Sequence, residues 1–289
     1  MVKTIGLEPL RKHISYTLYS GFVKNAIRPI STLEIAHPER GKSTEARRFD
    51  CIGAIEVQEL SAYGILREFK NMPPRERQHF HHIIIPDLEK IASKSRRFKL
   101  ELLSAIRVIS EEGYLRSWVK GMHFEFDKRL NVGFILCTTP EDIAHHSDIY
   151  KSSSFLSRFI PFTYDFSSDL KAEILNFVEQ EDRLTEDKTY LKREEGVDVR
   201  LPSYYTGVLT PYAKALACAV NEFAKKPDLD SDRVFGVRFK ENLMTYLKAI
   251  ALYDGCYRVR QQHFDEFREL FHFMNFRFNN IDEERGLVA

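Results

Sequence analysis

Short apolar runs alternate with amphipathic segments through the first half of the chain. The runs at residues 32–35, 49–57, 80–85 and 132–137 predict buried strands, and residues 114–126 alternate as a hairpin does. Apolar positions at helical spacing predict helices at residues 7–27, 42–48, 59–69 and 88–112. Strands that alternate with helices favour a parallel sheet, so we predict an α/β fold.

The pattern changes in the second half of the chain. Residues 179–198 are dense in charge and poor in large aliphatic side chains, which predicts an exposed helix or linker. Helical spacing then returns at residues 211–224, 239–253 and 264–276. We therefore predict an α/β domain over residues 1–195 and a smaller all-α domain over residues 196–289.

Composition and charge narrow the class of protein. The chain has 289 residues, of which 43% are hydrophobic and 29% are charged, and this composition excludes a disordered chain. The net charge of +1 speaks against a nucleic-acid binder that is basic over its whole surface, but it leaves a local basic patch open. The sequence has no run of 18 or more apolar residues, so we expect no membrane span.

The cysteines and the N-terminus bear on the cellular compartment. Four cysteines are scattered without a C-x-x-C pair, as is typical of reduced thiols in a cytosolic protein. Residues 1–4 lack the apolar segment of a signal peptide. The expected location is therefore the cytoplasm.

One short segment matches a motif with known chemistry. Residues 36–43 read A-H-P-E-R-G-K-S, which fits the phosphate-binding pattern G-x-x-x-x-G-K-[ST] with Ala36 in place of the first glycine. The predicted flanking strand and helix support the match, although a chance G-K-S is the alternative. Backbone N–H groups would face the phosphates, Lys42 would reach the β- and γ-phosphates, and Ser43 would hold Mg²⁺. The predicted nucleotide-binding residues are Ala36, Pro38, Glu39, Arg40, Gly41, Lys42, Ser43 and Thr44.

Acidic residues follow the third predicted strand. That strand ends in I-I-I-P-D-L-E, and a nucleotide hydrolase places its metal-binding Asp and its water-activating Glu at the end of such a strand. Asp87 lies one residue after the usual metal-binding position, in the place of the catalytic Glu. Pro86 occupies the usual position of the metal-binding Asp. Asp87 would then serve the metal together with Ser43, or Glu89 would assist it. The alternative is that Asp87 caps the following helix.

The motifs that follow, taken in order, resemble those of the AAA+ ATPases from about Leu10 to Leu270. After the strand at 132–137, Thr139, with Thr138 next in order, matches the position of the sensor 1 residue. The segment F-L-S-R-F places Arg158 where minichromosome-maintenance helicases carry the arginine finger, and Arg238 matches sensor 2 at the start of a lid helix. Residues 111–131, with Lys120 near the tip, resemble the pre-sensor hairpin of that clade.

The resemblance implies a P-loop NTPase domain followed by a helical lid. It implies bound ATP and Mg²⁺, with Asp87, Glu89, Thr139, Arg158 and Arg238 as the catalytic residues. Ring or filament assembly of identical chains is implied as well, with DNA or a DNA-processing protein as partner and no membrane. The implied function is ATP-driven remodelling of DNA or of a protein–DNA assembly, as in helicase loaders or transposition helpers.

Two other functions stay open. One is a nucleotide-dependent scaffold with little or no turnover, which Pro86 favours. The other is a protein-remodelling chaperone. For the hairpin, we expect Trp118, Tyr114 and Phe124 to form its apolar core rather than a platform on which bases stack.

Overall fold

The computed structural model describes residues 6–51, 53–88, 95–119, 121–152, 155–179, 189–191, 196–223 and 236–276. A parallel sheet lies at the centre, in the strand order β3-β4-β7-β1-β8. Its members are β1 (Thr32–Ile35), β3 (Ala54–Glu56), β4 (His82–Ile85), β7 (Gly133–Thr138) and β8 (Ile160–Thr163). Every neighbouring pair in this sheet is parallel, which confirms the predicted α/β class.

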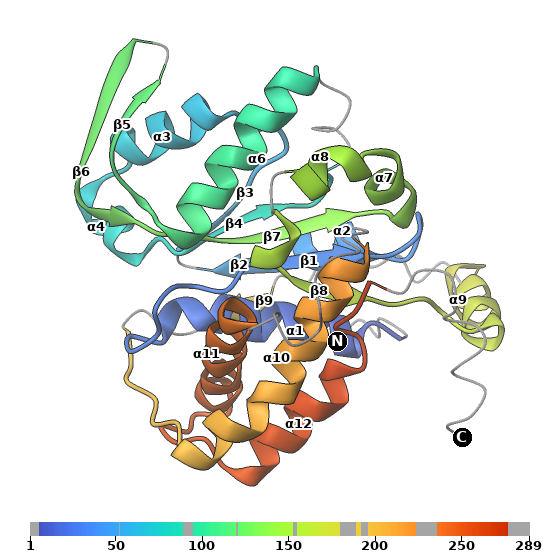
Figure 1. The fold of residues 1–289 in the computed structure, drawn as a ribbon. Coiled ribbons are helices and arrows are strands. Elements are labelled where there is room, and N and C mark those ends of the chain that lie inside the picture. The colour runs from blue at the N-terminus through green and yellow to red at the C-terminus, as the bar shows by residue number, and fades with distance from the viewer. Residues whose placement is uncertain are drawn as a thin grey trace.

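Helices cover both sides of the sheet (Figure 1). On one side lie α3 (Ala62–Asn71) and α6 (Arg96–Glu111), together with the antiparallel hairpin of β5 (Tyr114–Val119) and β6 (Met122–Leu130). On the other side lie α1 (Glu8–Tyr19), α10 (Ser203–Phe223), α11 (Val237–Tyr253) and α12 (Gln261–Phe271). None of the helices in the described ranges is long and apolar enough to cross a membrane.

The remaining elements are short or peripheral. They are η1 (Ser20–Phe22), α2 (Lys42–Arg47), α4 (Pro74–His79), α7 (Pro140–His145), α8 (Ser147–Ser152), η2 (Leu156–Arg158) and α9 (Ser168–Glu179). A separate parallel pair joins β2 (Phe49–Cys51) to β9 (Thr189–Leu191). Figure 1 shows α9 away from the helices that cover the sheet.

Several elements differ from the prediction for identifiable reasons. The first helix ends at Tyr19 instead of residue 27, because Val23 is extended and pairs with Val197. The strand predicted at residues 49–57 is divided near Gly53, whose φ is +94° and whose carbonyl accepts hydrogen bonds from the N–H groups of His81 and His82. A Cβ at Gly53 would lie 2.0 Å from a backbone oxygen, so only glycine fits this division.

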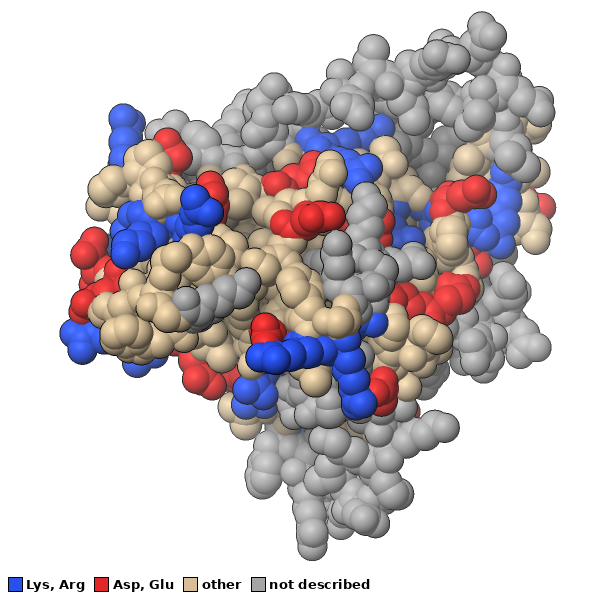
Figure 2. All heavy atoms as spheres, turned by 90° about the horizontal axis from the view of Figure 1, so that it is seen from above, with Lys and Arg blue, Asp and Glu red and all other residues tan. Residues whose placement is uncertain are grey.

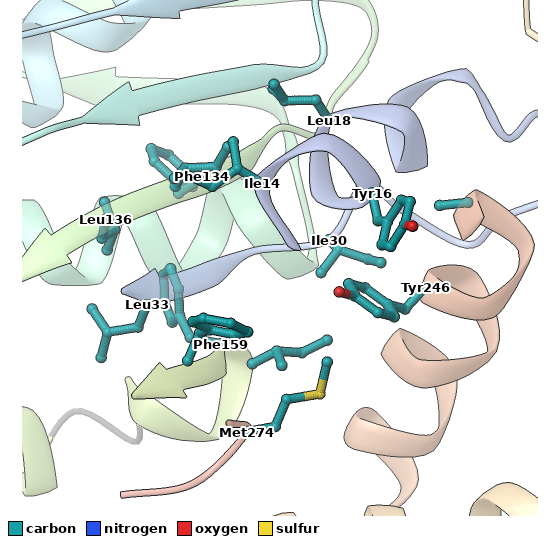
Figure 3. Close-up of a cluster of buried hydrophobic side chains, with 14 of the residues drawn as sticks. Ile14, Tyr16, Leu18, Ile30, Leu33, Phe134, Leu136, Phe159, Tyr246 and Met274 are labelled. Carbon is teal, nitrogen blue, oxygen red and sulfur yellow. The ribbon is translucent and has the colours of Figure 1, made fainter. Parts of the chain in front are cut away.

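The core joins the sheet to the helices on the side of α1. Ile14, Leu33, Phe134 and Phe159 are buried there, and Tyr246 of α11 points into the same cluster (Figure 3). The segment that the sequence assigns to the second domain therefore packs against α1, the first helix of the chain. The domain boundary at residues 195 and 196 stays a prediction.

A small polar network crosses this core. The Tyr246 hydroxyl lies 2.8 Å from Nδ1 of His13, and Nε2 of His13 lies 3.6 Å from Oε1 of Glu34. Thr32 donates a 2.7 Å hydrogen bond to the same Glu34 oxygen. Burial raises the pKa of Glu34 to about 8 and lowers that of His13 to about 3, so both side chains are neutral at neutral pH.

Candidate nucleotide site

The predicted phosphate-binding loop lies at the carboxyl edge of the sheet, between β1 and α2. Gly41 has a φ of +77°, and a Cβ there would meet Leu7 at 2.8 Å, so this position requires glycine. The Gly41 carbonyl accepts a 2.8 Å hydrogen bond from the Glu45 N–H, which closes the first turn of α2. The loop thus turns sharply from a buried strand into a helix N-terminus. Ligands bind at this edge of open parallel sheets.

Side-chain contacts hold the loop from both sides. Nε of Arg40 lies 2.6 Å from Oδ1 of Asp165, just beyond β8, and the Tyr164 hydroxyl donates to the Arg40 carbonyl across 2.9 Å. Nδ1 of His37 lies 2.7 Å from Oε1 of Glu141 in α7. Burial alone would raise the pKa of Asp165, but its hydrogen bond and charge interaction with Arg40 lower it overall. The loop is therefore tied to the ends of β7 and β8.

Lys42 and Ser43 open α2 next to the acidic segment. The Lys42 side chain is buried, and its Nζ donates across 3.4 Å to the His37 carbonyl within the loop. Ser43 donates a 2.5 Å hydrogen bond to the Pro86 carbonyl. Since Asp87 follows Pro86 directly, the structure brings Ser43 close to the backbone of the predicted acid. Pro38, Glu39 and Thr44 are exposed around the same loop, and Ala36 is buried at its start.

Cys137 of β7 contacts both the start of α2 and the segment after β4. Its Sγ lies 3.9 Å from the Lys42 carbonyl, and its own carbonyl accepts a 2.9 Å hydrogen bond from the Leu88 N–H. Burial raises the pKa of the Cys137 thiol. The charges of Glu34 and Asp87 raise it further, whereas the charge of Lys42 opposes them. Glu89, the other predicted acid, lies outside the described residues.

Thr139 lies at the end of β7 and caps the next helix. Its hydroxyl accepts a 3.1 Å hydrogen bond from the Asp142 N–H, and Thr138 donates to the Asp142 carboxylate across 3.0 Å. The Ala36 N–H donates to the Thr138 carbonyl, so this end of β7 adjoins the loop. The structure thus gives Thr139 a capping contact beside the candidate site.

Arg158 and Arg238 lie at the opposite edge of the sheet. Arg158 ends η2, one residue before β8 begins, and Ile160 of β8 pairs with Thr32 at the start of β1. The four residues of β1 separate this edge from the loop by roughly 13 Å. Both arginines contact Glu111 at the end of α6. The structure therefore brings the two predicted arginines together, but away from the loop of their own chain.

A cavity of about 200 Å³ lies beside the loop. Its walls include Phe162 of β8, Tyr164 and Phe166 from the segment after β8, and Phe273 after α12. The Arg40 guanidinium lies over the Phe166 ring, 5.9 Å from its centroid, which places the loop next to this aromatic wall.

The hairpin of β5 and β6 differs from the expectation. Phe124 is buried, as predicted, but 75% of Trp118 is exposed near the hairpin tip, so the prediction of a core role for Trp118 is wrong. The reason is that side chains alternate between the two faces of the hairpin. Phe124 packs against Tyr63 of α3, whereas Trp118 lies against the tilted ring of His123 at the free end. Lys120 lies outside the described residues. On the face shown in Figure 2, Lys and Arg groups lie beside Asp and Glu groups.

Sequence reasoning missed two residues of this arrangement. Asp165 follows β8, a strand that was not predicted, although its apolar run from Phe159 to Tyr164 is a usable signal. Glu111 looks like one of many acids on an amphipathic helix. Only the fold places it beside two arginines. Among the described residues, no group of three or more His, Cys, Asp or Glu side chains could hold a metal ion.

Comparison with known proteins defines the fold. No protein-family model and no curated protein matches the chain. Among solved structures, a full-length MCM homologue from Methanopyrus kandleri is similar, with a TM-score of 0.51 and 15% sequence identity. The match covers 93% of this chain and 55% of that protein, so the chain spans about half of its length. The chain therefore has an MCM-like fold, which agrees with the resemblance to AAA+ ATPases.

Proposed function

We propose that the protein binds and hydrolyses ATP at the loop of residues 36–44 and uses the energy to remodel DNA or a protein–DNA assembly. The observation that carries this proposal is the geometry of the loop: Gly41 turns it into α2, and Lys42 and Ser43 follow at the carboxyl edge of the parallel sheet. The MCM-like fold supports it.

Each residue at the loop has a distinct part in the proposal. Lys42, now bonded to the loop carbonyl of His37, turns its ammonium to the β- and γ-phosphates. Ser43 and Asp87 offer oxygen atoms to Mg²⁺, which prefers oxygen ligands. When bound, Mg²⁺ neutralises phosphate charge during transfer. Thr139 completes the polar side of the site, and the aromatic cavity beside Arg40 takes the base. Glu89 keeps its predicted part as the acid that assists Asp87.

The arginines act on a neighbouring chain. Because Arg158 and Arg238 lie at the sheet edge opposite the loop, they cannot reach the nucleotide of their own chain. In a ring or filament of identical chains, they reach the nucleotide of the neighbour, where guanidinium groups stabilise the charge of the transition state. Assembly and hydrolysis are then coupled.

The hairpin supplies the contact with DNA. Trp118 is exposed at the end of two strands that project from the body of the protein (Figure 1). An exposed aromatic side chain stacks on unpaired bases without regard to sequence. We therefore propose single-stranded DNA as the substrate that is moved or reshaped.

One observation favours the scaffold alternative. Ser43, the proposed metal ligand, is bonded to the carbonyl of Pro86, and Pro86 occupies the position of the usual metal-binding Asp. A chain that binds ATP, assembles and turns over little is consistent with this contact.

A turnover assay separates these functions. Phosphate release is measured for the wild type and Lys42→Ala, alone and with single-stranded DNA. The proposal predicts turnover that rises with DNA and depends on Lys42. ATP-dependent assembly with no turnover in either condition supports the scaffold. Stimulation by a protein client but not by DNA identifies the chaperone.

A further inference from the structure

One carboxylate joins the two arginines. Oε2 of Glu111 lies 2.5 Å from Nε of Arg158, and Oε1 of Glu111 contacts Nε of Arg238. Each carboxylate oxygen therefore forms an ion pair with a different guanidinium. The three side chains come from the end of α6, from η2 and from the first turn of α11, which are far apart in the sequence.

The electrostatics of this group depend on Glu111. The Glu111 and Arg158 side chains are only 14% and 9% exposed, whereas Arg238 is 47% exposed. Burial lowers the pKa of Arg158, and the nearby charges of Arg238 and Arg107 lower it further, while Glu111 opposes these effects. Two guanidiniums and one carboxylate give this group of three side chains a net charge of +1, and the nearby charge of Arg107 adds to the positive potential. The C-terminal end of α6 also favours cations at this place.

We propose that Glu111 is the positioning residue of the shared nucleotide site: its carboxylate fixes the spacing of Arg158 and Arg238 so that both meet the phosphates of a neighbouring chain's ATP. The inference rests on the proposed function. The remaining positive charge suits an incoming polyphosphate, and a pair of guanidiniums held in place needs little reorganisation when the interface closes. Without the carboxylate, like charges separate the arginines. A displacement of about 1 Å costs up to 100-fold in rate.

Mixed assemblies isolate this role. One chain carries Arg158→Ala and keeps its loop, and the other carries Lys42→Ala and keeps its arginines. Neither turns over ATP alone, and the mixture recovers turnover if sites are shared. The second chain is then replaced by Lys42→Ala/Glu111→Gln, which loses the charge but keeps the shape. We expect kcat of the mixture to fall about tenfold or more, with KM for ATP unchanged.

The matched control is Lys42→Ala/Glu112→Gln, which changes the adjacent, exposed acid. It should recover as much turnover as Lys42→Ala. Sedimentation checks that all pairs assemble equally, so that a loss of kcat reports positioning rather than assembly. If Glu111→Gln does not fold, Glu111→Asp, which is one methylene shorter, takes its place with the same expectation.

The outcomes are distinct. Full recovery with a Glu111 variant overturns the positioning role and leaves the shared site intact. No recovery even with Lys42→Ala alone, in pairs that co-assemble, overturns the shared site and the positioning role together. Calorimetric binding of ATP to the Arg158→Ala chain, which keeps its loop, separates both outcomes from a failure of the loop to bind nucleotide.

Discussion

The Ser43 hydroxyl donates to the Pro86 carbonyl across 2.5 Å, and this contact joins the start of α2 to the segment after β4. The two segments follow β1 and β4, which are not adjacent in the sheet because β7 lies between them. The contact therefore sets the spacing between the phosphate-binding loop and Asp87. In the proposed function, Ser43 and Asp87, on either side of this contact, would hold Mg²⁺.

Ser43→Ala should remove the part of ATP affinity that depends on Mg²⁺. The hydroxyl is the metal ligand that the loop contributes, and one charge-assisted contact is worth roughly 1.5–3 kcal/mol. We expect about tenfold weaker binding in Mg²⁺ and unchanged binding in EDTA, measured by calorimetry. Ser43→Thr keeps the hydroxyl and should bind as the wild type does. An equal loss in Mg²⁺ and EDTA would assign Ser43 a structural role only.

Arg40→Ala should loosen the loop. The guanidinium holds Asp165 in a partly buried ion pair, 22% and 11% exposed, and its loss frees the loop to sample other conformations. We expect ATP to bind about threefold to tenfold more weakly, because ordering the loop then occurs on binding. Arg47→Ala, which breaks a more exposed pair with Glu56, is the control and should leave the affinity unchanged. The prediction fails if both variants bind ATP equally well.

The buried pair of Glu34 and His13 should shape the pH dependence of stability. Glu34 keeps its proton up to about pH 8 in the folded chain but loses it near pH 4.5 when unfolded, so its contribution falls as pH rises between these values. His13 is protonated below about pH 6.5 only when unfolded, so its contribution falls as pH drops from 6.5 toward 3. The two slopes oppose each other between pH 4.5 and 6.5.

Glu34→Gln should therefore reduce the fall of the unfolding free energy as the pH rises above 6.5. Between pH 6.5 and 8, Glu34 alone contributes a slope of up to about 1.4 kcal/mol of unfolding free energy per pH unit. Urea unfolding at pH 5.5, 7 and 8 measures it. The acid-side loss caused by His13 should persist in the variant. The same alkaline slope in both proteins would show that Glu34 is ionised in the folded chain.

Trp118→Ala should weaken the binding of single-stranded DNA. Stacking of one base on an aromatic ring is worth about 1–3 kcal/mol, so the affinity should fall at least fivefold in fluorescence anisotropy. Tyr204, an aromatic side chain that is 67% exposed on α10, provides the control Tyr204→Ala, which should not change the affinity. Equal affinities for Trp118→Ala and the wild type would mean that the hairpin does not stack on bases.

The pattern of neighbouring residues predicted those elements that depend mainly on interactions close in the sequence. The strands at residues 32–35 and 133–138 are buried runs, and the loop between Ala36 and Gly41 has the signature of its own turn. The end of the first helix, by contrast, depends on the pairing of Val23 with Val197, and no residue near Val23 in the sequence indicates this pairing. The division near Gly53 likewise depends on backbone contacts with residues 81 and 82.

The candidate site shows the same limit. Lys42 and Ser43 are found by their motif, because adjacent residues form the phosphate cradle. Arg158 and Arg238 were found only by resemblance. Glu111 and Asp165 form ion pairs with arginines more than 40 residues away in the sequence. The spacing of charges along the chain does not reveal such pairs.

The central claim is that the loop of residues 36–44 binds ATP, and calorimetric titration with Mg-ATP of the wild type and Lys42→Ala tests it most directly. Removal of the ammonium leaves phosphate charge unpaired, which is worth roughly 1.5–3 kcal/mol. We predict measurable binding to the wild type and at least tenfold weaker binding to Lys42→Ala, while Lys24→Ala, away from the loop, binds as the wild type does. Equal affinity of the wild type and Lys42→Ala, or no binding to the wild type, would contradict the account.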